Sequence, residues 1–282
     1  MIMKALICKI LRLYIRYFPV RKAKIPLLGL FERMGVFHNM ELNTSIGNHT
    51  RVLLSIDDWV QRLVYFFGVY EFEKTETAMW IDYAKRSNHI LDIGSNFGYY
   101  SLLASDVNPG SKIMAFEPAP TMFQRLTHNL NLNAYSNVLP LNLGVSNEKG
   151  RFDFFVADNK HSGMSGLSMP DGIDGQKIQV EITTVDQILA DYGDVKPDLI
   201  KIDVEGNELN ALLGMKHMFS VCKPVFFIEI YDRNLAKFGH SRDMVFDFFK
   251  DQGYSIMEVG TQNRLVHIDQ PKDIGLAICI PN

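Results

Sequence analysis

The sequence has 282 residues, of which 47% are hydrophobic and 22% are charged, a composition typical of a soluble globular protein. A chain of this length buries enough apolar surface to fold without a disulfide or metal staple, which excludes disulfide scaffolds, collagen-like repeats and disordered chains. The three cysteines, Cys8, Cys222 and Cys279, form no CxxC pair. We therefore expect a reducing compartment and a cytoplasmic protein.

Charge is distributed unevenly along the sequence. Residues 1–31 contain seven basic side chains and no acidic one, whereas the remaining 251 residues contain 22 basic and 32 acidic side chains and carry a net charge of −10. Because a nucleic-acid-binding surface must neutralise phosphates, this acidic body predicts that nucleic acid is not a partner.

Residues 2–18 have the periodicity of a helix that the following proline ends. Lys9, Arg12 and Arg16 share one face of this helix, and apolar side chains occupy much of the rest. Two interpretations stay open. Either residues 1–24 contact the anionic cytoplasmic face of a membrane peripherally, or the helix packs on the body of the protein with its basic side chains in solvent. The sequence indicates no oligomeric state.

Beyond residue 88, apolar runs typical of strands alternate with helical stretches. Before that point, residues 25–58 show only weak periodicity, and residues 58–85 are mainly helical with a break around Gly68. The expected strands are 89–93, 112–117, 138–143, 199–203, 225–231, 254–259 and 274–280, and the expected helices are 98–107, 121–133, 185–192, 208–220 and 242–252. This alternation predicts an α/β fold with a doubly wound, mostly parallel sheet.

One interruption breaks the alternation. Residues 151–157 and 177–183 are expected to form two extra strands, joined by a glycine- and serine-rich stretch at 161–175. A long polar loop inside an α/β domain is usually functional or disordered. His161 in this stretch is a candidate substrate contact.

The strongest local motif is a strand that ends in Asp92, a turn with Gly94 and Gly98, and then a helix. Glycines allow a ligand to approach the backbone closely, and a helix amino terminus offers N–H groups. The glycine spacing differs from the GxGxxG fingerprint of NAD-binding proteins. Asp92 would repel a pyrophosphate but suits the ammonium and sulfonium groups of S-adenosylmethionine (SAM). Taken alone, the motif also fits a plain strand, turn and helix.

The next expected strand ends in Glu117, nineteen residues after Gly98. A carboxylate at this position can accept hydrogen bonds from both ribose hydroxyls of an adenosine cofactor. Glu117 by itself does not distinguish SAM from NAD. It is equally consistent with a solvent-exposed acidic residue at the end of a strand that binds no ligand.

Lys201 and Asp203 alternate on one face of a later strand, near the carboxyl end where open α/β sheets bind ligands. They form either a buried structural ion pair or part of a site in which Asp203 takes a proton from a hydroxyl nucleophile. Glu229, inside the apolar run of the following strand, is a further site candidate because buried carboxylates are rare unless paired. Asp203 and Glu229 offer the oxygen ligands that a divalent cation prefers, although we assign no metal to the site.

With these residues identified, the chain resembles the FkbM-type SAM-dependent methyltransferases over residues 57–232. The motifs that carry the resemblance are Asp57–Arg62, Gly68–Glu71, the turn with Asp92, Gly94, Asn96 and Gly98, Phe116–Pro118, and Ile200–Gly206. Ser95 and Phe97 depart from the family pattern, in which alanine and isoleucine or valine often flank Asn96.

The resemblance implies a class I methyltransferase (Rossmann-like) fold over residues 57–282, after a basic amphipathic extension at residues 1–56. It implies transfer of a methyl group from SAM to a hydroxyl oxygen of a glycan or secondary-metabolite acceptor. The implied cofactor-binding residues are Asp92, Gly94, Asn96 and Gly98 for the methionine end, Glu117 for the ribose, Asn142 beside Leu143 for the adenine, Asp203 beside the methyl group and Glu71 to close the pocket. The candidate catalytic residues are Asp203, Glu205, Lys201 and Glu229.

Three other functions compete with this one. An NAD-dependent oxidoreductase needs a turn that seats a pyrophosphate, which Asp92 disfavours. A methyltransferase for nitrogens of RNA or protein often carries an Asn-Pro-Pro-Tyr-like segment after the fourth strand, where this sequence has Asp203–Gly206. A non-catalytic interaction module would leave the clustered site residues unexplained.

Overall fold

A computed structural model describes residues 2–18, 21–158, 160–169, 172–193, 195–260 and 264–282. The predicted end of the first helix at Pro19 and residues 170 and 171 of the glycine- and serine-rich stretch lie outside the described residues. The elements before the central sheet are α1 (Ile2–Tyr17), α2 (Lys24–Arg33), β1 (Glu41–Ile46), β2 (Thr50–Ser55), α3 (Trp59–Phe67), the 3₁₀ turn η2 (Glu71–Glu73) and α4 (Lys74–Ala84).

The central sheet has eight strands in the order β12-β11-β13-β10-β9-β3-β4-β5. The five strands from β10 to β5 are parallel, whereas β13, β11 and β12 pair antiparallel at the other edge. Their bounds are β3 (His89–Ile93), β4 (Lys112–Phe116), β5 (Val138–Leu141), β9 (Leu199–Ile202), β10 (Val225–Ile230), β11 (Tyr254–Val259), β12 (Leu265–His267) and β13 (Ile274–Pro281). This is the doubly wound, mostly parallel sheet that the alternation of elements predicts.

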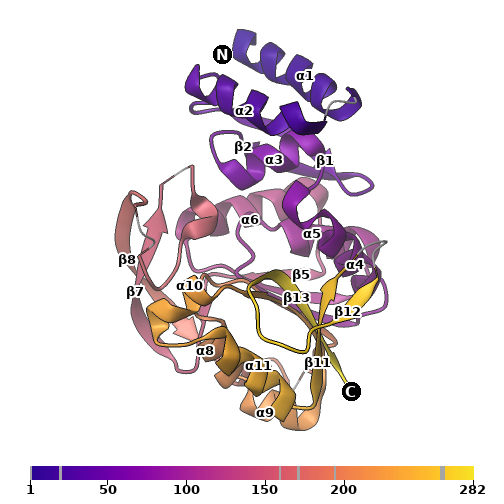
Figure 1. The fold of residues 1–282 in the computed structure, drawn as a ribbon, viewed down its shortest axis with the longest axis vertical. Coiled ribbons are helices and arrows are strands. Elements are labelled where there is room, and N and C mark those ends of the chain that lie inside the picture. Colours follow the sequence, from indigo (N-terminus) through magenta and orange to yellow (C-terminus); the bar gives the residue numbers. More distant parts are fainter. Residues whose placement is uncertain (1, 19–20, 159, 170–171, 194, 261–263) are drawn as a thin grey trace.

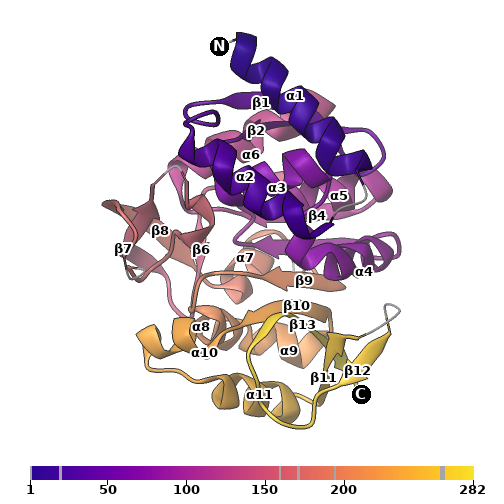
Figure 2. The same cartoon turned by 45° about the horizontal axis from the view of Figure 1, so that its top comes forward.

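Helices cover both faces of the sheet, with α4, α5 and α6 on one side and α8, α9 and α11 on the other (Figures 1 and 2). Consecutive side chains of a strand therefore belong to hydrophobic clusters on opposite faces of the sheet. Ile90 packs in one of these clusters and Leu91 in the other. Because both faces are buried, the strands are continuous apolar runs. The helices after β3 are α5 (Tyr99–Val107), α6 (Pro120–Asn133), α7 (Val185–Asp191), α8 (Glu208–Leu213), α9 (Lys216–Val221), α10 (Asp232–Leu235) and α11 (Arg242–Asp251).

A second sheet of three strands lies beside the first, in the order β6-β8-β7. Its strands are β6 (Gly144–Val145), β7 (Gly150–Ala157) and β8 (Gly175–Thr183), and the 3₁₀ turn η3 (Ser162–Met164) lies in the loop that joins β7 to β8. The two extra strands predicted from the sequence are therefore confirmed, and the polar stretch is their connection.

The predicted helix over 208–220 is wrong as a single element, because it is divided into α8 and α9. The division lies at Gly214, where a Cβ atom would be 2.2 Å from the carbonyl oxygen of Ser146. A side chain at this position would collide with backbone, so the close contact between these two segments requires glycine. The strands β1, β2 and β12 have no counterpart in the sequence-based assignment.

The first helix packs on the body of the protein. Cys8, Leu11 and Ile15 of α1 are buried in the same hydrophobic cluster as Leu63 and Val64 of α3. Both sides of the predicted boundary between residues 56 and 57 contribute to this cluster, and the boundary itself stays a prediction. In the described part of the chain, every helix is too short or too polar to span a membrane.

Candidate active site

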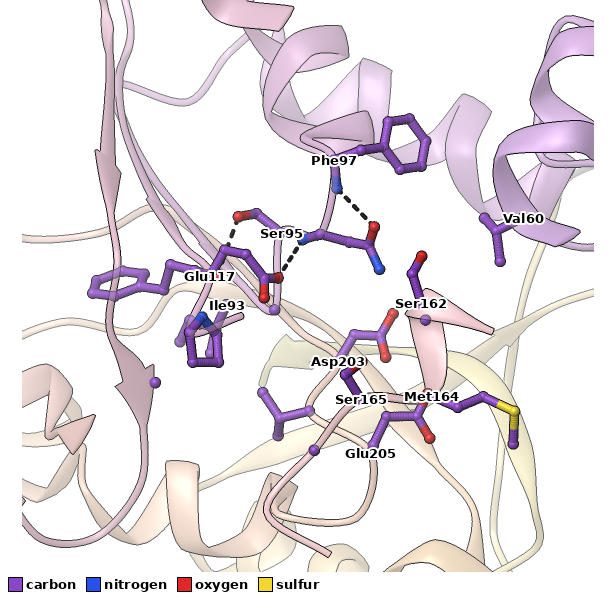
Figure 3. Close-up of a pocket in the computed structure, with 18 of the residues that line it drawn as sticks. Val60, Ile93, Ser95, Phe97, Glu117, Ser162, Met164, Ser165, Asp203 and Glu205 are labelled. Carbon is purple, nitrogen blue, oxygen red and sulfur yellow. Dashed lines mark hydrogen bonds between the residues drawn. The ribbon is translucent and has the colours of Figure 1, made fainter. Parts of the chain in front are cut away.

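The carboxyl ends of the parallel strands surround a cavity of about 280 Å³, close to the lower end of the usual range for ligand pockets. Loops that follow β3, β4 and β9 form its floor, and the loop between β7 and β8 lies opposite them (Figure 3). Its polar lining includes Glu73, Asn96, Tyr100, Glu117, His161, Lys201, Asp203, Glu205 and Glu229. The cavity therefore lies at the sheet edge that the sequence indicates.

The turn after β3 contacts the loop after β9 through Gly94. A Cβ atom on Gly94 would lie 1.8 Å from the carbonyl oxygen of Asp203, and its φ of 82° is in the left-handed region. Asn96 also has a positive φ, of 50°, which asparagine tolerates better than most residues. Its side-chain oxygen accepts a hydrogen bond from the Phe97 N–H at 2.8 Å. Gly94 thus allows the glycine turn and Asp203 to be neighbours.

Asp92 lies below this turn and does not line the cavity. Its Oδ2 accepts a hydrogen bond from the Ser101 hydroxyl at 2.5 Å, and its buried Oδ1 has no hydrogen-bond partner within the described residues. Burial raises the pKa of Asp92, and the nearby Lys201 opposes this shift. Asp92 therefore supports the first turn of α5 and places a carboxyl group beside Lys201.

Glu117 is almost fully buried at the cavity wall. Its Oε2 accepts the backbone N–H of Asn96 and its Oε1 accepts that of Ala119, both at 2.8 Å. Burial raises the pKa of Glu117 to about 7, and these two hydrogen bonds oppose the shift. Each carboxylate oxygen has a second lone pair, so Glu117 can still accept hydroxyl donors from a ligand.

Asn142 lies outside the cavity lining, although its neighbour Leu143 belongs to it. The Asn142 amide donates to the carbonyl oxygens of Glu117 and Pro118, at 2.8 and 3.1 Å. Asn142 therefore fixes the loop that carries Glu117. A contact of Asn142 with adenine stays a prediction.

Lys201 is buried at the centre of the site, with its Nζ 2.7 Å from Asp203 Oδ2 and 4.6 Å from the centroid of the Tyr100 ring. Burial alone would lower the pKa of Lys201. The carboxylates of Asp203, Glu73 and Asp92 outweigh it and raise that pKa. Lys201 is thus a buried cation that holds Asp203 in place.

Asp203, Glu205 and Glu229 each place a carboxylate oxygen within 4.8 Å of the others. Burial raises the pKa of Glu205 to about 8, and the negative charge of Asp203 adds to this shift. The pKa of Glu229 is raised well above its ordinary value, first by burial and then by the charge of Asp203. Such a group can bind a proton at neutral pH, and its oxygens are also of the type that coordinates a divalent cation.

The loop between β7 and β8 is anchored over the cavity by Asp58. Its Oδ2 accepts the Ser162 N–H at 3.0 Å and the Ser162 hydroxyl at 2.6 Å, while its Oδ1 caps α3 through the Gln61 N–H at 2.8 Å. His161 lines the cavity, and its Nδ1 lies 2.8 Å from Asp158 Oδ1. Ser162, Met164 and Ser165 face Asp203 and Glu205 across the cavity in Figure 3.

Glu73 is a cavity residue that the sequence analysis does not single out. The Tyr100 hydroxyl donates to its carboxylate at 2.5 Å, and burial raises its pKa. Glu71, the residue proposed to close the pocket, lies instead in a separate hollow beside Arg16 and Lys74. Both glutamates belong to the same 3₁₀ turn, and the sequence does not show which of them points inward.

Comparison with known proteins connects this site with one family. The model of the methyltransferase FkbM domain matches residues 92–256. The chain belongs to the FkbM methyltransferase family. The matched FkbM region includes the turn from Asp92 to Gly98, Glu117, the segment from Lys201 to Glu205, and Glu229.

Curated relatives carry related names. Hexuronic acid methyltransferase AglP of Haloferax volcanii is 31% identical over 144 residues, which cover 51% of this chain and 56% of AglP. Methyltransferase sdnD of Sordaria araneosa is 33% identical over 154 residues, which cover 45% of this chain and 60% of sdnD. The chain thus spans little more than half the length of these relatives.

Among solved structures, a methyltransferase FkbM from Methylobacillus flagellatus aligns with a TM-score of 0.44 and 19% identity, over 79% of this chain and 55% of that one. The family assignment together with the strand order of this chain identifies the fold as the class I methyltransferase fold that the sequence predicts. Upstream of the matched region, the N-cap of α3 and the turn η2 supply Asp58 and Glu73 to the site.

Proposed function

We propose that the protein is a SAM-dependent O-methyltransferase that acts on a hydroxyl group of a glycan or a secondary metabolite. The observation that carries this proposal is the position of Asp203, which lines the cavity next to the glycine turn and is held by the buried Lys201. Membership of the FkbM family supports the cofactor and the reaction.

The residues present fit SAM. Glu117 has lone pairs left to accept the ribose hydroxyls, and the glycine turn around Gly94 and Asn96 would hold the methionine end. Acidic side chains outnumber lysines in the cavity lining, an arrangement that suits a cationic ligand. Asp92 contributes charge from below the turn without lining the cavity. When bound, SAM supplies a methyl group activated by a sulfonium.

Asp203 is the proposed general base. Lys201 donates to Oδ2, and no donor to Oδ1 is found within the described part of the chain. Asp203 would therefore take the hydroxyl proton of the acceptor at Oδ1 as the acceptor oxygen is methylated. Glu205 and Glu229, whose pKa values are raised by burial and by the charge of Asp203, provide neighbouring positions to which this proton can pass.

The acceptor class rests on the relatives and on the loop that covers the cavity. One relative is named a hexuronic acid methyltransferase, and another is named 31-O-demethyl-FK506 methyltransferase FkbM, from Streptomyces tacrolimicus, at 26% identity over 154 residues. The loop presents His161, Ser162 and Ser165 to the cavity. Such side chains form hydrogen bonds with hydroxyl-rich molecules.

The test separates cofactor binding from chemistry. Calorimetry should show that SAM and S-adenosylhomocysteine bind and that NAD does not. Asp203→Asn should keep its affinity for SAM but lower methyl transfer by about 10²–10⁴-fold, the usual contribution of a general base. Transfer is measured with radiolabelled SAM on a panel of uronic-acid-containing oligosaccharides and hydroxylated polyketides.

The matched control is Asp251→Asn, which changes an exposed aspartate of α11 and should leave transfer unchanged. Full transfer by Asp203→Asn would show that another group is the base, with Glu205, Glu229 and His161 as the alternatives in the cavity. Absence of SAM binding to the unmodified protein would overturn the proposed function. If a chelator abolishes activity and Mg²⁺ restores it, the carboxylates of Asp203, Glu205 and Glu229 bind a divalent cation instead.

A further inference from the structure

Helix α1 is apolar on two opposite faces. One face, with Cys8, Leu11 and Ile15, is buried against the body. The opposite face repeats apolar residues at helical spacing of three and four positions and is exposed, from 56% at Leu6 to 87% at Ile2. This exposed stripe consists of Ile2, Met3, Leu6, Ile10, Leu13 and Tyr17. A helix that is apolar around most of its circumference is normally buried on all sides, so the exposed stripe lacks a partner.

The neighbouring helix α2 carries further exposed apolar side chains. Helices α1 and α2 lie together at one end of the molecule, away from α9 and α11 (Figures 1 and 2). Leu30 and Met34 at the end of α2 are also exposed, at 52% and 66%. Large contiguous apolar patches on a protein surface mark sites of interaction with other proteins or with membranes.

The basic side chains beside the exposed stripe indicate which kind of partner it binds. Lys9 and Arg16 follow the stripe along one side of α1, and Lys22 is exposed before α2. Lys4 and Arg16 donate to backbone carbonyls, and Arg12 stacks on the Tyr65 ring at 4.6 Å. Among the described side chains of residues 1–31, the six cations Lys4, Lys9, Arg12, Arg16, Lys22 and Lys24 form no ion pair with an acid. Arg16 and Lys24 line the same hollow as Glu71, whereas Lys9 and Lys22 are exposed and can meet an anionic partner.

We propose that the exposed stripe of α1 and its flanking cations dock the protein peripherally on an anionic lipid bilayer. An apolar stripe beside lysine and arginine side chains matches the boundary between acyl chains and anionic headgroups. A second copy of the chain is a poorer partner, because its stripe would bring an equal cluster of positive charge against this one. The proposal does not depend on the reaction in the cavity.

Co-sedimentation of the full chain with lipid vesicles tests the proposal. The protein should pellet with vesicles of phosphatidylcholine mixed with phosphatidylglycerol, but not with vesicles of phosphatidylcholine alone, and high salt should release it. The triple variant Leu6→Ser/Ile10→Ser/Leu13→Ser should reduce the partition coefficient at least about tenfold, because three apolar side chains no longer insert. The double variant Lys9→Gln/Lys22→Gln should reduce it by about fivefold for each charge.

A matched control removes exposed apolar side chains elsewhere. Val221→Ser/Met244→Ser/Val266→Ser changes residues that are also 41–46% exposed, on α9, α11 and β12, and should leave vesicle binding intact. Thermal melting verifies that each variant is folded. No binding to anionic vesicles at low salt, or binding that the triple α1 variant keeps, would overturn the proposal. Sedimentation equilibrium that shows a dimer abolished by the same variant, with no vesicle binding, would assign the stripe to self-association instead.

Discussion

Individual carboxyl groups in the cavity differ in how the protein holds them. Asp203 is paired with a lysine, and Glu117 accepts two backbone N–H groups. Glu229 lies beside other acids and has no cation partner of its own among the described residues. These environments give the residues different chemistry, although all are acids at the ends of strands. Glu117 suits the recognition of hydroxyl donors, and Asp203 suits proton transfer.

Glu117→Gln should weaken SAM binding by about 1.5–3 kcal/mol, the value of a hydrogen bond to a charged group. Glutamine has only one acceptor oxygen, so it cannot accept both the Asn96 and the Ala119 N–H groups. Calorimetry measures the affinity, with Glu148→Gln, an exposed glutamate, as the control. Because burial raises the pKa of Glu117 to about 7, affinity in the unmodified protein should increase between about pH 6 and pH 8. An unchanged affinity in Glu117→Gln would exclude this residue as the ribose ligand.

The sequence correctly predicts those cavity residues that lie at or next to the carboxyl end of a parallel strand. Glu117, Lys201, Asp203 and Glu229 reach the cavity because parallel strands end at one edge of the sheet. Glu73 could not be predicted in the same way, since its direction is set by a 3₁₀ turn and by the Tyr100 hydroxyl, which comes from another element. Asp92 has a strong sequence motif, but its burial below the turn depends on packing against α5.

Secondary-structure elements were predictable where their patterns are strong. The parallel strands are mainly apolar runs, three of which are followed directly by glycine or an acidic residue, and their predicted bounds agree with the structure to within two residues. β1 and β2 were not assigned because their alternation is weak, and each pairs only with the other. The division of the predicted 208–220 helix lies at Gly214, whose close approach to the distant Ser146 carbonyl is a contact that local sequence does not encode.

The loop over the cavity depends on the cap of α3. Asp58→Ala should lower the free energy of unfolding by about 2–4 kcal/mol, because it removes a helix cap and leaves buried Ser162 donors without an acceptor. It should also speed proteolytic cleavage within residues 160–169, measured by limited proteolysis beside chemical denaturation. Ser241→Ala, which removes the cap of α11 far from the cavity, should cost about 1 kcal/mol without exposing the loop. Equal protease resistance of the two variants would show that Asp58 does not anchor the loop.

In the whole molecule, acidic and basic residues are concentrated in different parts of the fold. The acidic groups gather where the parallel strands end, and the basic residues that precede Glu32 gather around α1 and α2. The sequence shows this asymmetry as a basic segment followed by a body of net charge −10. It does not show that α1 packs on α3 through one face and exposes the other, because both faces are apolar.

The buried acids also make the stability of the ligand-free protein depend on pH. Burial raises the pKa of Glu117 and Glu208 to about 7 and that of Glu205 to about 8, whereas the same groups in the unfolded chain titrate near 4.5. Between about pH 4.5 and pH 8 the folded protein therefore binds more protons than the unfolded chain. Its free energy of unfolding should fall as pH rises through this interval, by up to about 1.4 kcal/mol per pH unit for each such group.

Urea denaturation at several pH values measures this slope, and Glu208→Gln should reduce it. Glu208 Oε1 accepts the N–H groups of Val204 and Gly206 at 3.1 Å, and the glutamine oxygen can keep both bonds while removing the titration. His240, whose pKa is lowered by burial, acts in the opposite direction but only below about pH 6.5. Stability that rises from about pH 6.5 to pH 8 would contradict the raised pKa values of these glutamates, and with them the proposal that Glu205 can receive a proton from Asp203 at neutral pH.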